Sequence, residues 1–257
     1  MITILTFTCI TNYVLAAYAC RFRMRGYASR QFIFLFSFIA IVLHGFLLYK
    51  AIETGAGQNL DLGNVLSLVG WLVACLLMLT ALRKPVEVLG IFIFPISALL
   101  VLNVWLFPGQ VILNTKESPL QLIHILTSLL AVSMIGLSAL QAVALFMQAS
   151  RLRRHASGQL LSVFPALETL ESLLFSTIWL GFGLLSISLI TGLIYWFNEQ
   201  DSHILLKVIF VIIAWCIFAT LLLGRYLLKW RGTHAINWTL IGLGLLIIAY
   251  LGTHYLN

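Results

Sequence analysis

Two histidines, His44 and His124, stand inside long apolar segments of the chain, where an ionisable side chain needs a reason. An imidazole can bind a metal ion, transfer a proton or form hydrogen bonds. At membrane depth it is costly unless it faces the interior of a helix bundle and meets a partner there. Both residues are therefore candidate ligands, and the helices that carry them decide what chemistry is open to them.

The composition is that of a membrane protein. Of 257 residues, 61% are hydrophobic and only 9% are charged, which no soluble domain of this size needs. Apolar runs near the ~20 residues that cross a bilayer recur along the whole chain. They predict an all-α polytopic protein embedded in the lipid bilayer, a single domain over 1–257 with eight transmembrane helices near 2–20, 32–49, 64–82, 87–107, 120–148, 174–197, 205–223 and 238–256.

The positive charges indicate topology and do not form a nucleic-acid surface, so no nucleic-acid partner is expected. The net charge of +7 comes from short basic clusters between apolar runs. Alternate loops hold twelve of the fifteen Lys and Arg residues: Arg21, Arg23, Arg25, Arg30, Arg83, Lys84, Arg151, Arg153, Arg154, Arg225, Lys229 and Arg231. The positive-inside rule makes these loops cytoplasmic and places both termini outside the membrane.

This orientation puts His44 and His124 at a similar depth, roughly 6–9 Å inside the outer interface at about 1.5 Å of helix rise per residue. Two imidazoles on different helices at one depth could hold the iron of a haem between them. His124 and His44 are therefore candidate ligands of a haem iron. The alternative is an interhelical hydrogen bond that needs no cofactor, with Ser67, Asn64 or Asn103 as possible partners.

Two loops differ from the short connections elsewhere. The outer loop "AIETGAGQNLDLGN" is polar and glycine-rich, which indicates a segment that turns back over the membrane surface and is mobile or faces a ligand. In the inner segment "GQLLSVFPALETLESLLF", leucines recur at helical spacing opposite Glu168 and Glu171. This pattern predicts a short cytoplasmic interfacial helix near 160–173.

Several stretches together resemble the cytochrome c assembly proteins of the CcsA and CcmC type. They are "LIHILTSLLAVSMIGLSALQA", "FPALETLESLLFSTIWLGFGLLSISLITGLIYW" and "KWRGTHAINWTLIGLGLLIIAYLGTHYL". "GQNLDLGNVLSLVGWLVACLLMLTALR" is similar to a bacterial inner-membrane subgroup, the YpjD type, which has eight spans and a histidine in the second. The resemblance implies a multi-pass protein of the bacterial inner membrane.

The resemblance also implies a haem cofactor. In the wider family two outer histidines ligate haem, and a tryptophan-rich loop of the WWD type presents that haem to apocytochrome c. His124 matches the first of these histidines, His254 lies near the second, and His44 matches the histidine of the subgroup. The expected haem site residues are thus His124, His44 and His254, and the expected partners are haem and other membrane or cytochrome c maturation proteins.

The chain departs from the family at the loop that presents haem. It reads "YWFNEQDSHILLK" there, with Trp196 but no WWD sequence. A haem-binding accessory factor in cytochrome c biogenesis, and not an enzyme, is therefore expected. The alternatives are a membrane scaffold that has lost haem and binds a partner protein, or, less favoured, a transporter of small solutes, for which the spans offer few acidic residues.

Overall fold

The computed structural model describes the chain except residues 28, 56, 114–118, 154–165, 200–201 and 255–257. Its contacts divide the chain into two compact units. Unit 1 comprises Met1–Asn114 with Arg151–Ala166, and unit 2 comprises Thr115–Ser150 with Leu167–Asn257. The sequence predicted a single domain over 1–257. The division into two compact units does not test this, so it stays a prediction.

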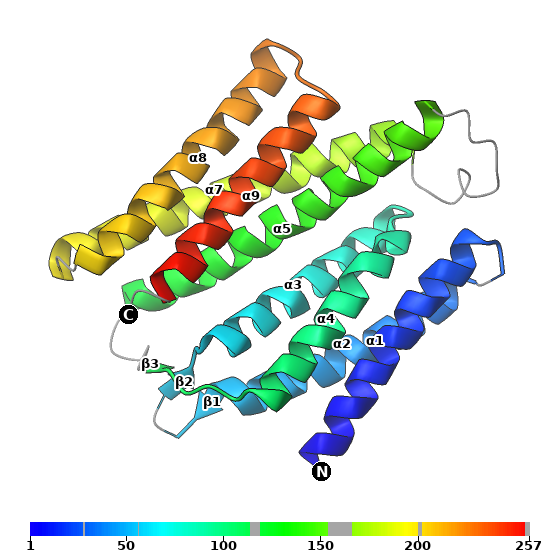
Figure 1. Ribbon diagram of the computed structural model, residues 1–257, viewed down its shortest axis with the longest axis horizontal. Helices are drawn as coiled ribbons and strands as arrows, with labels where there is room; N and C mark the ends of the chain where they lie inside the picture. The colour runs from blue at the N-terminus through cyan, green and yellow to red at the C-terminus, as the bar shows by residue number, and fades with distance from the viewer. Residues whose placement is uncertain (28, 56, 114–118, 154–165, 200–201, 255–257) are drawn as a thin grey trace. The chain divides into compact units, whose positions relative to one another are not determined.

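Unit 1 is a bundle of four long helices, drawn from blue to green in Figure 1. They are α1 (Ile2–Met24), α2 (Arg30–Ile52), α3 (Leu62–Arg83) and α4 (Gly90–Leu106), and a short 3₁₀ turn, η1 (Glu87–Leu89), precedes α4. Gly26, with a φ of 81°, lies in the turn between α1 and α2. Pro95 lies inside α4 without ending it, as neighbouring helices allow within a bundle.

The first helix shows how this bundle packs. Cys9, Tyr13, Ala16 and Cys20 are fully buried, and their spacing of three and four residues places them on one face of α1. The thiol of Cys9 donates to the carbonyl of Ala40 on α2 at 3.4 Å. Small side chains let the helices approach closely, which is how membrane bundles gain contact without a hydrophobic driving force.

A small antiparallel sheet covers one end of unit 1, the end at which α1 begins (Figure 1), and we call it the sheet end. It consists of β1 (Glu53–Thr54), β2 (Gly57–Asn59) and β3 (Ile112–Leu113), in the order β1-β2-β3. Thr54 pairs with Gly57, and Asn59 pairs with Ile112. The polar outer loop is thus a hairpin paired to the segment that follows α4.

Asn59 extends this pairing with its side chain. Its Nδ2 donates to the carbonyl of Gly109 at 2.9 Å, and its Oδ1 accepts from the amide of Val111 at 2.9 Å. Asp61 then caps α3 by accepting from the amide of Gly63 at 2.9 Å, the usual role of an acidic residue at a helix start. The sequence did not predict this connected structure.

Unit 2 contains the remaining long helices: α5 (Pro119–Arg153) up to Ser150, α7 (Leu167–Glu199), α8 (Ser202–Leu227) and α9 (Thr233–His254). Glycine allows two close approaches: a Cβ at Gly181 of α7 would lie 3.0 Å from Ile135, and one at Gly242 of α9 would lie 2.5 Å from Phe218. The indole of Trp215 on α8 donates to Ser186 Oγ on α7 at 2.9 Å.

The predicted spans are confirmed, because in the described residues eight helices are long and apolar enough to cross a membrane. The expected interfacial helix lies partly outside the described residues. Its described part, from Leu167, forms the first turns of α7 and runs on into the span. The leucine face of these turns is confirmed, since Leu170 and Leu174 are fully buried while Glu168 is exposed.

Candidate functional site

His44 lies in the interior of unit 1, held between hydroxyl groups from two other helices. Its Nδ1 is 3.0 Å from the hydroxyl of Tyr13 on α1, and its Nε2 is 2.9 Å from Oγ of Ser67 on α3. The side chain is only 1% exposed. A neutral imidazole has one donor and one acceptor nitrogen, so one hydroxyl donates to the ring and the other accepts from it. The hydrogen bond to Ser67 was among the alternatives considered from the sequence.

Tyr13 connects this histidine to the fourth helix. Its ring meets His44 edge to face, with centroids 5.7 Å apart, and stacks on Phe94 of α4 at 6.0 Å. Tyr13 and Phe94 are both fully buried. Because each of the four helices contributes a side chain, the His44 network fixes how they pack together.

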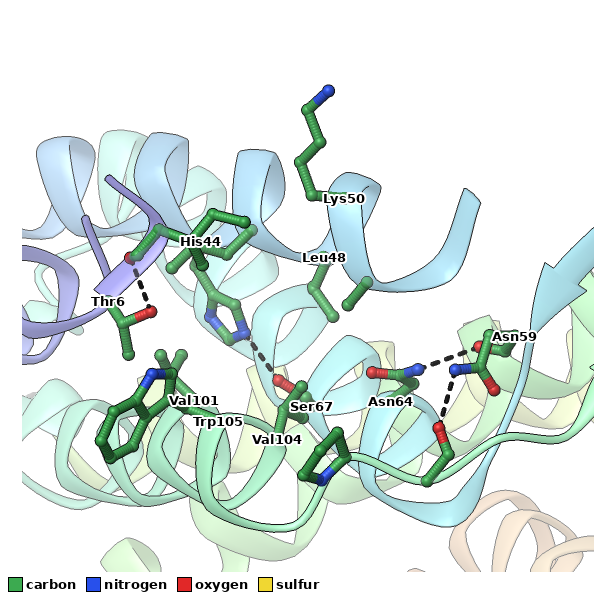
Figure 2. A pocket seen from close by; sticks show the side chains of 15 residues that line it. Thr6, His44, Leu48, Lys50, Asn59, Asn64, Ser67, Val101, Val104 and Trp105 are labelled. Atoms are coloured by element: carbon green, nitrogen blue, oxygen red, sulfur yellow. Dashed lines mark hydrogen bonds between the residues drawn. The ribbon is translucent and has the colours of Figure 1, made fainter. Parts of the chain in front are cut away.

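A pocket of about 220 Å³ extends from His44 to the sheet end of unit 1 (Figure 2). Its walls come from all four helices and from the two loops that the sheet joins. The residues that line it are Ile2, Thr6, His44, Leu47, Leu48, Lys50, Ala51, Asn59, Asn64, Ser67, Val101, Val104, Trp105, Pro108 and Gly109. Most are apolar, and the polar ones come from α1 (Thr6), α2 (His44 and Lys50), the hairpin (Asn59) and α3 (Asn64 and Ser67).

His124 lies on α5 in unit 2 and has a different environment. Its Nδ1 is 2.9 Å from the carbonyl oxygen of Ser188 and 3.3 Å from Oγ1 of Thr191, both on α7. A carbonyl oxygen can only accept, so Nδ1 carries the proton. The Thr191 hydroxyl donates to the Ile187 carbonyl at 2.9 Å and is left to accept from the ring as well.

This arrangement leaves the other ring nitrogen of His124 available. Nε2 then holds a lone pair, and it has no hydrogen bond to any residue that the structure describes. The ring also lies against Gly192 of α7, where a Cβ would come within 2.8 Å of Cε1. The Ser188 carbonyl and Gly192 of α7 thus fix the orientation of the His124 ring, and Nε2 is not part of these contacts.

The remaining predicted site residue, His254, is the last residue of α9, and its side chain lies outside the described part of the structure. His254 and His124 both belong to unit 2, whereas His44 belongs to unit 1. Their joint role at one haem stays a prediction.

Sequence reasoning missed a cluster around Glu87 in unit 1. Its carboxylate is 1% exposed and lies 3.0 Å from Nε of Arg23 and 3.5 Å from Nε of Arg30. These contacts are ionic, because among the described residues neither carboxylate oxygen has a partner in hydrogen-bond alignment. Arg30 also donates to the carbonyl of Ala81. Two arginines that indicated only topology thus pair with a buried acid.

Unit 2 has a similar cluster around Glu171. Oε1 of Glu171 accepts from Arg225 Nη1 at 2.6 Å and from Arg231 Nε at 2.9 Å, and this carboxylate raises the pKa of Arg231. The guanidinium of Arg225 also lies 4.5 Å from the ring centroid of Phe175. In each unit one glutamate therefore joins two arginines from the predicted cytoplasmic loops.

The fold and these sites define a polytopic membrane protein with histidines fixed inside its helical units. The chain belongs to the cytochrome C assembly protein family, whose model matches residues 2–257. It is 29% identical over 219 residues to the inner membrane protein YpjD of Escherichia coli strain K12, covering 84% of this chain and 82% of the relative. YpjD of E. coli O157:H7 gives the same values.

A second kind of relative is similar over a shorter region. The cytochrome c biogenesis protein CcsA of Guillardia theta is 34% identical over 97 residues, which cover 37% of this chain and 32% of the relative. No solved structure matches the chain significantly. The family resemblance seen in the sequence is confirmed, and family membership supports a role related to cytochrome c biogenesis.

Proposed function

We propose that the chain is a haem-binding accessory factor of cytochrome c biogenesis in the bacterial inner membrane, with His124 as an axial ligand of the haem iron. Family membership supports the broader role. The observation that carries the finer one is the 2.9 Å contact between His124 Nδ1 and the Ser188 carbonyl. Metal-binding histidines almost always donate their other ring N–H to such an acceptor, which fixes the tautomer and the direction of the ring.

The residues around His124 fit one axial ligand of a haem. A bound haem would supply an iron that an imidazole nitrogen can ligate. Nε2 would be that nitrogen, because Nδ1 donates to the Ser188 carbonyl; Thr191 adds a second contact to Nδ1–H, and Gly192 lets the ring lie against α7.

The second ligand stays a prediction between His44 and His254. His44 would have to give up its contact with either Tyr13 or Ser67, because both of its ring nitrogens are engaged. We therefore propose that His44 serves the packing of unit 1 first and that His124 would hold the iron.

The proposed role is non-enzymatic. Residues 195–207 read "YWFNEQDSHILLK" and lack the tryptophan-rich sequence that would present haem to an apoprotein. The protein would bind haem at the outer face and act with other membrane proteins of cytochrome c maturation.

Reconstitution with haemin tests this function. The protein is purified in mild detergent, and its Soret band is compared between wild type, His124→Ala and His234→Ala. His234 is exposed and stacks on Trp230, so it controls for the loss of a histidine. We expect His124→Ala alone to lose the band. No Soret band in the wild type, or one unchanged by His124→Ala, would refute the assignment.

A membrane scaffold that has lost haem is the second candidate. It is favoured by the internal satisfaction of both His44 nitrogens and by the missing tryptophan-rich sequence. Native purification separates the two functions: a stoichiometric partner protein without bound chromophore supports the scaffold, whereas a chromophore lost in His124→Ala supports the haem protein.

A further inference from the structure

We propose that the pocket in unit 1 binds the hydroxylated aromatic ring of a membrane quinol. This site is separate from His124, and the proposal does not depend on haem. It follows from the polar groups on α3, from the size of the pocket and from the absence of acidic side chains among the described residues that line it.

Asn64 presents a free acceptor to this pocket. The residue is 3% exposed, and its Nδ2 donates to the carbonyl of Asn59 at 3.1 Å. That bond fixes which way the amide faces, and Figure 2 shows the oxygen on the side away from Asn59. Among the described residues no donor reaches Oδ1. A ligand hydroxyl would satisfy this oxygen.

Ser67 provides a second polar position one turn along α3, on the same face as Asn64. Other hydroxyl groups in unit 1 are used within their own helix: Thr6 and Thr80 each donate to the carbonyl one turn earlier, at 3.1 and 2.7 Å. By contrast, the one hydrogen bond of the Ser67 hydroxyl within the described part of the structure is the one to His44, at 2.9 Å. A hydroxyl can make more than one hydrogen bond, so Ser67 keeps capacity for a ligand. The two side chains together suit a group that both donates and accepts.

The rest of the pocket suits a small apolar ring. Leu48, Val101 and Val104 form apolar walls, and Trp105 adds an aromatic side chain (Figure 2). The volume of about 220 Å³ is below the ~300–1,000 Å³ typical of sites for drug-sized ligands. One substituted ring fits this space better than an extended molecule or a macrocycle.

The ligand should be uncharged. None of the described residues that line the pocket is acidic, and the one Lys or Arg among them is Lys50, which is exposed. The ammonium of Lys50 lies 5.9 and 5.8 Å from the ring centroids of Phe46 and Tyr49, two residues that are not part of the lining. A hydroxylated ring on an apolar tail, which can enter from the bilayer, meets all of these requirements.

Photolabelling tests the proposal on the full-length protein in lipid nanodiscs. The probe is an alkylphenol with a diazirine on its chain, and labelled peptides are mapped by mass spectrometry. The competitors are para-pentylphenol, its methyl ether para-pentylanisole, and a reduced short-chain ubiquinol. We expect label in the pocket peptides, competition by the phenol and the quinol, and about fivefold weaker competition by the ether, which lacks one hydrogen-bond donor.

Three variants make the result specific. Val104→Phe fills the pocket, leaves the contacts of His44 intact and should abolish the label. Ser67→Ala should weaken it, whereas Thr80→Ala, which removes a hydroxyl elsewhere on α3, should leave it unchanged. Thermal unfolding shows that each variant is folded. Label spread evenly over lipid-facing residues, equal competition by the ether, no competition by the quinol, or full labelling of Val104→Phe would overturn the proposal.

Discussion

Nε2 of His44 and Oγ of Ser67 lie 2.9 Å apart and join α2 to α3 in the interior of unit 1. The ring is held from its other side by Tyr13 on α1. The histidine thereby links three helices through side chains that are all buried. Hydrogen bonds of this kind contribute about 0.6–2 kcal/mol each in membranes.

Replacing Tyr13 by Phe should therefore destabilise unit 1 by about 1 kcal/mol, since the aromatic packing remains while one nitrogen of His44 loses its partner. Thermal unfolding in detergent measures this change. Tyr18→Phe is the control, because Tyr18 is exposed on the same helix. Equal unfolding temperatures for the two variants would contradict a structural role for the Tyr13 hydroxyl.

Gly192→Ala should lower haem loading without removing the histidine. The new Cβ would lie 2.8 Å from Cε1 of His124, so the ring must leave the Ser188 carbonyl. Gly183 is the matched control on α7, because a Cβ there meets no atom within 4 Å. Soret absorbance after reconstitution should fall for Gly192→Ala and stay at the wild-type level for Gly183→Ala. A normal band in both would show that the position of this ring does not matter for loading.

Glu87→Gln should destabilise unit 1 more than Glu168→Gln destabilises unit 2. Removing one partner of a fully buried ion pair costs about 3–5 kcal/mol, but Arg23 and Arg30 are 28% and 41% exposed, so solvent reduces the cost here. Glu168 is exposed and serves as the control. Thermal unfolding measures the loss of stability in each variant. Equal unfolding temperatures would mean that the ion pairs of Glu87 do not contribute to the stability of unit 1.

Gly57→Ala should open the hairpin. Gly57 has a φ of 146°, a backbone conformation that strains any residue with a Cβ. A Cβ there would also lie 2.6 Å from the carbonyl oxygen of Leu113, so it would clash with β3. Gly55→Ala is the control in the same hairpin, with no atom within 4 Å of the new Cβ. Limited proteolysis should cut Gly57→Ala within residues 53–61 faster than either wild type or Gly55→Ala. Identical cleavage would contradict the prediction.

The eight helices could be predicted because each is a long apolar run, and length with apolarity is what a bilayer selects. The sheet could not, because strands of two or three residues such as Glu53–Thr54 carry no readable alternation. For the same reason the sequence indicated only a polar loop where Asn59 connects two segments.

The candidate site was predictable to the level of residues but not of atoms. An apolar context singled out His44 and His124, and Ser67 was one of three partners considered, beside Asn64 and Asn103. Which ring nitrogen is engaged depends on groups distant in sequence, such as the Ser188 carbonyl, and a carbonyl leaves no trace in residue type. The pairing of Glu171 with Arg225 could not be predicted either. A basic loop indicates topology whether or not its arginines form ion pairs.

The side chain of Asn59 extends the pairing of β2 with β3, because it hydrogen-bonds to the backbone of Gly109 and Val111 in the segment that follows α4. We therefore expect residues 53–61 and 107–113 to be exchangeable only as a pair. A chimera that takes only one of them from a relative will bring a mismatched register to the other. Anyone grafting the outer surface of unit 1 onto another member of the family must transplant both segments together.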